Sequence, residues 1–260
     1  MEATSVASPL SKADLHVHTC HDGWGDGNDT VEDIFDYVQS NTDLMLLALT
    51  DHDSTDAARA GRKLHTLDKY RFDFLPGVEV TTTAGHLLCY FPGEISDVPS
   101  LRSLTWTTGF VHDRGGICIL AHPVYPPWLR RSVVKPHSRT VRMVDAVEVI
   151  NGGLSEGAQA KLDDIGATLA GRASLVANSD SHHKESIGSN YTEFPGATAA
   201  DYVAALKKRQ TRPEQGTRVT MSREARSFTR RRSMTRPGWV RNVYREVSGK
   251  RRDKDEKTHE

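Results

Sequence analysis

Two histidines with a single residue between them, His16 and His18, are the first residues in the chain whose types and spacing could do chemistry. In a β-strand, residues two apart point to the same face, so the two imidazoles would project together from the C-terminal end of a short buried strand. Neutral imidazole is a good ligand for Zn, Fe and related divalent ions. The pair can therefore hold a metal. The alternative is a solvated strand that carries two histidines by chance, and the residues further along the chain distinguish the two.

Polar residues follow similar short apolar runs at several later points. The runs, typical of strands covered on both faces, are 44–49, 74–80, 85–91, 117–120, 146–150 and 175–177. The candidate ligands in or just after them are His52, Glu79, His86, His122, Asp180 and His182. With His16, His18 and one loop aspartate, these donors exceed what one metal needs and predict a cluster of two or three divalent ions. Glu79 is suited to bridge two of them.

Helices are predicted between these strands. Thr30 followed by Asp33 is close to a capping box and begins an amphipathic segment. Further helices are expected at about 55–68, 101–114, 158–169 and 199–210. Strands alternating with helices predict parallel βα units, about seven strands in all. Polar residues follow nearly every strand, whereas an open doubly wound sheet would concentrate them at one switch point. The pattern therefore favours a barrel.

Composition and charge suggest how the chain is divided. Residues 1–210 hold 19 Lys+Arg against 27 Asp+Glu, whereas residues 211–260 hold 15 against 7. We expect an acidic barrel domain at 1–210 and a basic C-terminal tail at 211–260, partly helical or disordered. No apolar run approaches the 18 residues of a transmembrane helix, and the N-terminus does not resemble a signal peptide. A cytoplasmic protein is expected.

The ordered blocks DLHVHT, TDHD, PGVEV, GHLLCYF, AHP and NSDSH resemble the PHP (polymerase and histidinol phosphatase) family of metal-dependent phosphoesterases, in its stand-alone branch. The resemblance covers about residues 12–210. It implies an α/β fold, a distorted (βα)7 TIM-like barrel, with a trinuclear metal site at the C-terminal rim of the strands. The implied cofactors are two to three divalent ions, Mn, Fe or Zn.

Carried over by motif, the family's ligands fall into three groups. The first metal would be held by His16, His18, Glu79 and Asp180. The second would be held by Glu79, His86 and His122. The third would be held by His52, His182 and the loop aspartate. The family usually places that aspartate in Ser-Asp-Gly before the helix, whereas this chain has Asp22-Gly23 and Asp26-Gly27. Asp26 keeps the usual spacing to Val31 and is favoured, with Asp22 and His21 as alternatives.

The expected reaction is hydrolysis of a phosphomonoester, nucleotide-like or a small metabolite. Metals about 3.5–4 Å apart can activate a bridging hydroxide for attack and hold both attacking and leaving oxygens. Glu79, Asp180 and His182 are the predicted catalytic residues. No G-x-S-x-G elbow or Walker loop offers a competing nucleophile or phosphate cradle. A catalytically silent metal-binding or regulatory module, or a 5′–3′ exonuclease acting on short RNA or DNA, are the alternatives.

Phosphate recognition would also need cations. Arg130, Arg131 and Lys135 follow the AHP block and are the predicted substrate-binding residues, because that loop must lie at the same rim. A solvated basic loop is the alternative. The basic tail favours an anionic partner such as a nucleotide or a short nucleic acid.

Overall fold

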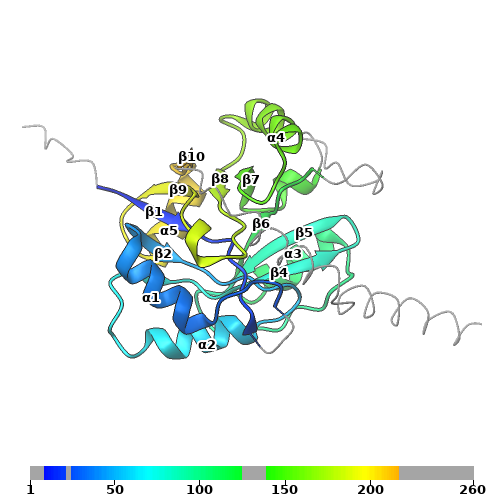
Figure 1. The fold of residues 1–260 in the computed structure, drawn as a ribbon. Coiled ribbons are helices and arrows are strands. Elements are labelled where there is room, and N and C mark those ends of the chain that lie inside the picture. The colour runs from blue at the N-terminus through cyan, green and yellow to red at the C-terminus, as the bar shows by residue number, and fades with distance from the viewer. Residues whose placement is uncertain (1–8, 22–24, 125–138, 217–260) are drawn as a thin grey trace, which may run out of the picture. The chain divides into compact units, whose positions relative to one another are not determined.

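The computed structural model describes residues 9–21, 25–124 and 139–216, all within one compact unit of residues 1–220 (Figure 1). Its strands are β1 Leu10–Asp14, β2 Leu44–Leu47, β3 Asp73–Phe74, β4 Gly77–Thr82, β5 Gly85–Tyr90, β6 Ile117–Leu120, β7 Ala146–Asn151, β8 Leu175–Asn178, β9 Asn190–Pro195 and β10 Arg212–Gln215. Its helices are α1 Val31–Asn41, α2 Asp56–His65, α3 Leu104–His112, α4 Glu156–Leu169 and α5 Ala199–Lys208, with 3₁₀ turns at Arg139–Arg142 and Lys184–Ser186.

The strands form two five-stranded sheets, in the orders β10-β9-β1-β2-β3 and β4-β5-β6-β7-β8. The fold is therefore mixed α/β, but the described strands do not close into the barrel that the sequence predicted. Two isolated parallel bridges connect the sheets just past the strand ends. One joins Val17 to Ser181 and the other joins His52 to Glu79. All four residues of these bridges lie at or beside predicted ligands.

Strand direction also differs from the predicted run of parallel units. β4, β5 and β6 pair antiparallel, and so do β1, β9 and β10 in the other sheet. β4 and β5 are joined by only two residues, Thr83 and Ala84, and a connection this short can join only antiparallel strands. β9 and β10 were not predicted, and β10 extends the folded body into the segment expected to be tail.

An apolar cluster fed by both sheets fills the space behind these strand ends. Alternate residues of β6 point to opposite faces of the sheet. Ile117 and Ile119 pack in this cluster, and Cys118 and Leu120 pack in a second cluster under α3 and α4. Leu15 and Val17 are fully buried on either side of His16. The Tyr90 hydroxyl donates to the Leu15 carbonyl at 2.7 Å, which links β5 to the segment after β1. The histidine segment is thus fixed by buried neighbours.

The helices begin at or within about three residues of the predicted starts; α3 begins at Leu104 rather than 101, and α4 at Glu156 rather than 158. Thr30 caps α1, and Asp33 returns the bond to the Thr30 backbone, completing the capping box. α4 packs against β7 and α3 against β6, whereas α5 packs against β9 and adds Tyr202, Ala205 and Leu206 to the cluster that both sheets share (Figure 1). None of the helices in the described ranges has the length and apolar character needed to span a membrane.

Candidate metal centre

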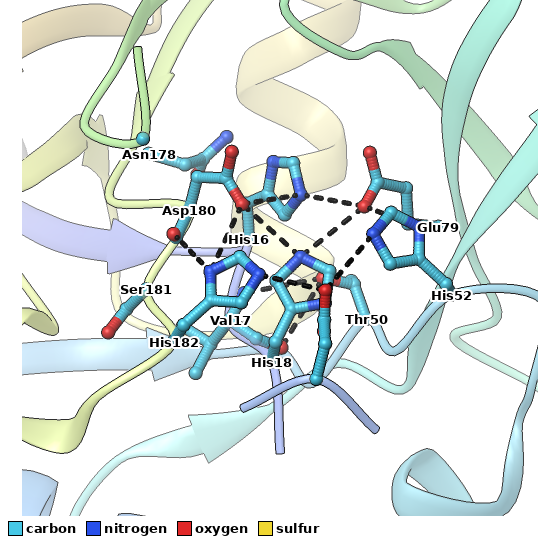
Figure 2. A network of polar contacts seen from close by, with 12 residues as sticks. His16, Val17, His18, Thr50, His52, Glu79, Asn178, Asp180, Ser181 and His182 are labelled. Carbon is cyan, nitrogen blue, oxygen red and sulfur yellow. Dashed lines mark hydrogen bonds and ion pairs between the residues drawn. The ribbon is translucent and has the colours of Figure 1, made fainter. Parts of the chain in front are cut away.

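The segment after β1 carries His16 and His18 into the centre of the site. The strand itself ends at Asp14, but the extended backbone continues between two neighbours. The amide of His18 donates to the Ser181 carbonyl at 2.8 Å, and the amide of Thr50 donates to the Val17 carbonyl at 2.9 Å. Residues two apart in this extended stretch share a face, so both imidazoles face the same cluster of carboxylates (Figure 2).

Glu79 lies at the centre of the histidines. Its Oε2 is 3.2 Å from His16 Nε2, 3.3 Å from His18 Nε2 and 3.2 Å from His52 Nδ1. Its Oε1 is 2.8 Å from His86 Nδ1 and 3.1 Å from His122 Nε2. His86 reaches this position from the start of β5, because that strand runs antiparallel to β4. One buried carboxylate therefore faces five imidazoles.

Two further carboxylates flank this centre. Asp180 Oδ1 lies 3.4 Å from His16 Nε2 and 3.2 Å from His18 Nε2. Asp180 has a φ of 51°, an uncommon conformation for a non-glycine residue and one found often at functional sites. Asp26 lies on the other side, 3.3 Å from His18 Nδ1, 3.1 Å from His182 Nε2 and 3.6 Å from His52 Nε2. The structure thus brings all nine predicted ligands together.

The position of Asp26 depends on the glycines that flank it. A Cβ on Gly25 would lie 2.0 Å from the Thr19 carbonyl oxygen, and one on Gly27 would lie 2.3 Å from the His18 carbonyl oxygen. The Gly27 amide donates to the Thr19 carbonyl at 2.9 Å. Only residues without a Cβ can pack this closely on the backbone. These close approaches hold Asp26 beside His18; Asp22 lies outside the described residues.

The donor set fits divalent ions. Several buried polar atoms have no hydrogen-bond partner in the described part of the chain: His16 Nε2, both ring nitrogens of His18, Asp26 Oδ1 and Glu79 Oε2. Such groups are costly when left unsatisfied. They also fall into groups of three donors whose atoms lie within 4.8 Å of one another. Imidazole and carboxylate donors at this density are ligands that divalent metal ions take in proteins.

Electrostatics within the cluster favours charged carboxylates. Burial alone would raise the pKa of Glu79, but the imidazoles of His52, His86 and His16 hold it well below its usual range. The pKa of Asp180 is likewise lowered against burial, chiefly by His16 and His18. Burial lowers the pKa of His52 to about 4, against the pull of Glu79 and Asp26. A neutral His52 keeps a lone pair available for coordination.

The sequence reasoning missed the buried carboxylates behind the ligands. Glu148 of β7 is fully buried, and its Oε1 lies 3.2 Å from His16 Nδ1. Asp51 accepts from the Thr19 amide at 2.6 Å, and burial raises its pKa. Asp14 accepts from the amide of Ser179, and burial raises its pKa to about 6. Each is an acid inside or beside an apolar run, a signal that was available in the sequence.

The predicted phosphate-binding cations, Arg130, Arg131 and Lys135, lie outside the described residues. His21 is described, and its amide donates to the Thr19 hydroxyl at 2.9 Å.

Comparisons with known proteins place the chain in a family. It is 31% identical over 123 residues to the uncharacterized protein MJ1587 of Methanocaldococcus jannaschii, a match covering 44% of this chain and 69% of that protein. A family model described as PHP-associated matches residues 173–211. The chain belongs to the PHP family. The matched segment runs from just before β8 through β9 and α5, and so includes Asp180 and His182 of this PHP protein.

Solved structures share the PHP fold with this chain. One is a two-domain protein containing a predicted PHP-like metal-dependent phosphoesterase from Bacteroides vulgatus, with a TM-score of 0.58 and 18% identity over 80% of this chain and 66% of that one. Another is the lesion-specific endonuclease PfuEndoQ from Pyrococcus furiosus, with a TM-score of 0.53 and 17% identity over 79% of this chain and 58% of that one. At these identities the likeness concerns the fold.

Proposed function

We propose that this PHP protein is a metal-dependent phosphoesterase that hydrolyses a phosphomonoester, either nucleotide-like or a small metabolite. The position of Glu79 carries the proposal, because its two carboxylate oxygens together face five imidazoles at 2.8–3.3 Å. A carboxylate between two sets of neutral donors suits a bridge between ions, as in hydrolases that use paired metals. The names of the similar structures, a phosphoesterase and an endonuclease, support chemistry on phosphate esters.

The proposed ligand sets follow the observed neighbours. His16, His18, Glu79 and Asp180 would hold one ion. Glu79, His86 and His122 would hold a second ion. Asp26, His52 and His182 would hold a third ion. We propose two to three ions of Mn, Fe or Zn, since imidazole and carboxylate suit all three metals.

Bound divalent ions would act as Lewis acids on the phosphoryl oxygens and on water. The carboxylates of the chain would hold negative charge at fixed positions around the ions. Glu79 and Asp180 would keep two negative charges fixed between the histidines. His182 Nδ1 lies 3.0 Å from the Asp180 carbonyl, which turns Nε2 toward Asp26. His182 is 24% exposed, so the third ion, which it would hold through Nε2, would lie on the solvent side of the site.

A nuclease acting on short RNA or DNA is the second candidate. The likeness to a lesion-specific endonuclease and the basic residues 211–260 favour it. Arg130, Arg131 and Lys135 remain the proposed cationic contacts to the substrate phosphate in either case.

A substrate panel tests the proposal. The purified chain is incubated with Mn²⁺, Fe²⁺ or Zn²⁺ and with nucleotides, nucleoside 3′,5′-bisphosphates, sugar phosphates, amino-alcohol phosphates and short RNA, and phosphate release is measured. Dialysis against a chelator should abolish release, and one of the ions should restore it. Shortened RNA without phosphate release from small esters would favour the nuclease. Bound metal with no turnover of any ester would favour the catalytically silent module.

A further inference from the structure

We propose that Glu148 is a positioning residue of the metal centre, fixing which nitrogen of His16 faces the ions and holding His122 in register. The inference rests on the proposed metal site but not on the substrate or the reaction. Glu148 lies in the middle of β7, fully buried, and is not one of the nine predicted ligands.

Four groups surround the Glu148 carboxylate, two on each oxygen. Oε1 lies 3.2 Å from His16 Nδ1 and 2.8 Å from the side-chain amide nitrogen of Asn178. Oε2 accepts from the backbone amide of His122 at 2.8 Å and from the side-chain amide of Asn151 at 3.0 Å. Four donors match the lone-pair sites of an ionised carboxylate. The ends of β1, β6, β7 and β8 are thereby joined at one acid.

The two asparagines cannot turn to offer oxygens instead. Asn178 Oδ1 already accepts from the Leu15 amide at 2.9 Å, and Asn151 Oδ1 accepts from the Gly153 amide at 2.9 Å. Rotating either side chain would set its NH₂ against a backbone N–H. The environment of Glu148 is therefore built from donors only, and it requires an acceptor at this position.

An acceptor at position 148 determines which ring nitrogen of His16 carries the hydrogen. A carboxylate only accepts, so His16 Nδ1 must carry the hydrogen. In the neutral ring the lone pair then lies on Nε2, the nitrogen that faces Glu79 and Asp180. Such outer acceptors fix the tautomer and ring orientation of metal-binding histidines. Through the His122 amide, the same carboxylate also positions a second predicted ligand.

The charge of Glu148 also fits a position behind bound metal ions. In the described part of the chain, Glu148 contacts one imidazole, two amides and one backbone N–H, but no Lys or Arg. A fully buried carboxylate without a cationic partner is costly. A divalent ion held by His16 Nε2 would offset its charge from the far side of that ring.

The test compares Glu148→Gln with wild type in the full-length chain, by equilibrium dialysis against Mn²⁺ at one pH. A glutamine NH₂ would face two of the four donors, so Mn²⁺ should bind about 10- to 100-fold more weakly, the usual effect of losing an outer-shell partner. In the zinc-loaded wild-type protein, ¹⁵N NMR should find the hydrogen of His16 on Nδ1. Zinc on Nδ1 instead would make Glu148 a ligand of that ion and overturn the inference.

Asp145→Asn is the matched control. Asp145 Oδ2 also binds an imidazole and a backbone amide, at 2.8 Å to His112 Nε2 and 2.7 Å to the Cys118 amide, near the opposite end of β6. It should leave Mn²⁺ affinity unchanged. Equal weakening in both variants, or wild-type affinity in Glu148→Gln, would overturn the inference.

If Glu148→Gln fails to fold, Glu148→Asp replaces it. The shorter acid keeps the charge but cannot reach all four donors, so it should also bind Mn²⁺ at least tenfold more weakly, and wild-type affinity would overturn the inference. A wild-type chain that binds Mn²⁺ but hydrolyses no ester would overturn the proposed function alone.

Discussion

At the scale of single residues, the orientation of a ligand histidine is set by the group that binds the ring nitrogen facing away from the cluster. His16 has Glu148 at Nδ1, and His182 has the Asp180 carbonyl at Nδ1. Each ring then turns its Nε2 toward the carboxylates of the cluster. Side chains fixed in this way lose little freedom when an ion binds, so more of the binding free energy is retained.

Glu79→Gln should remove more than one ion at once. The amide keeps the shape of the side chain but has one weak oxygen donor in place of a carboxylate that faces five imidazoles. Elemental analysis of the purified variant should show a loss of about two of the two to three metal equivalents. Glu94→Gln, at an exposed position, should keep them all. Loss of a single equivalent in Glu79→Gln would contradict the bridging role.

The sequence predicted eight of the nine ligands because each lies in or just after an apolar run, whereas Asp26 was favoured by its spacing to Val31 in the family's motif. Glu148 was not predicted. It sits inside the run Ala146–Asn151, and its partners His16 and Asn178 are 132 and 30 residues away. Only the tertiary structure shows which buried acid serves which histidine.

At the scale of elements, the loop before α1 packs closely on the backbone of the histidine segment. Gly27→Ala should push residues 25–27 away from the His18 backbone, because the new Cβ would lie 2.3 Å from the His18 carbonyl oxygen. We expect a destabilisation of about 1–3 kcal/mol, typical of overpacking, and loss of the ion held by Asp26. Calorimetry and metal analysis on the same sample check both.

Gly109→Ala is the control for that substitution. Gly109 lies inside α3, and a Cβ added there would have no atom within 4 Å beyond its own helix backbone and chain neighbours. Alanine at this position should stabilise the protein by about 0.5–1 kcal/mol and leave the metal content unchanged. A stable, fully metallated Gly27→Ala would show that the loop does not depend on this close approach.

The capping box of α5 gives a prediction with a pH dependence. Asp201 accepts from the amides of Ala197 and Thr198, and these bonds lower its pKa. A lowered pKa means that its stabilising effect is present above the unfolded value of about 3.9 and disappears as the pH falls through the folded value. Asp201→Asn should therefore have a lower Tm than wild type at pH 7, with the difference shrinking below about pH 4. Asp164→Asn, exposed on α4, should show no such pattern.

Helix starts were predictable because caps are local, as Thr30 and Asp33 show at α1. Strand direction was less so. The run at 85–91 was read as one more parallel strand, although the four residues between it and the run at 74–80 are too few for the crossover that parallel strands need. β9, Asn190–Pro195, mixes polar and apolar residues on both faces and carries no long apolar run, so its pairing with β1 could not be predicted from the sequence pattern.

At the scale of the molecule, the catalytic proposal needs only the first part of the chain. All nine proposed ligands and Glu148 lie between residues 16 and 182, and the two sheets that hold them meet at the Val17–Ser181 and His52–Glu79 bridges. The last described strand, β10, pairs with β9, and the Gly216 amide donates to the Ser189 carbonyl at 2.9 Å. The folded body therefore extends past residue 210, to Gly216.

Truncation after Gly216 should leave the metal content and the turnover of a small phosphomonoester nearly unchanged. The removed residues hold 14 Lys+Arg against 6 Asp+Glu, so if they recruit nucleic acid, the truncated chain should bind short RNA more weakly. Its affinity should also fall less steeply with salt, because each lost phosphate contact removes a released counterion. Truncation after residue 210, which deletes β10 as well, should by contrast lower the Tm. Loss of metal on removing residues 217–260 alone would show that the site depends on them.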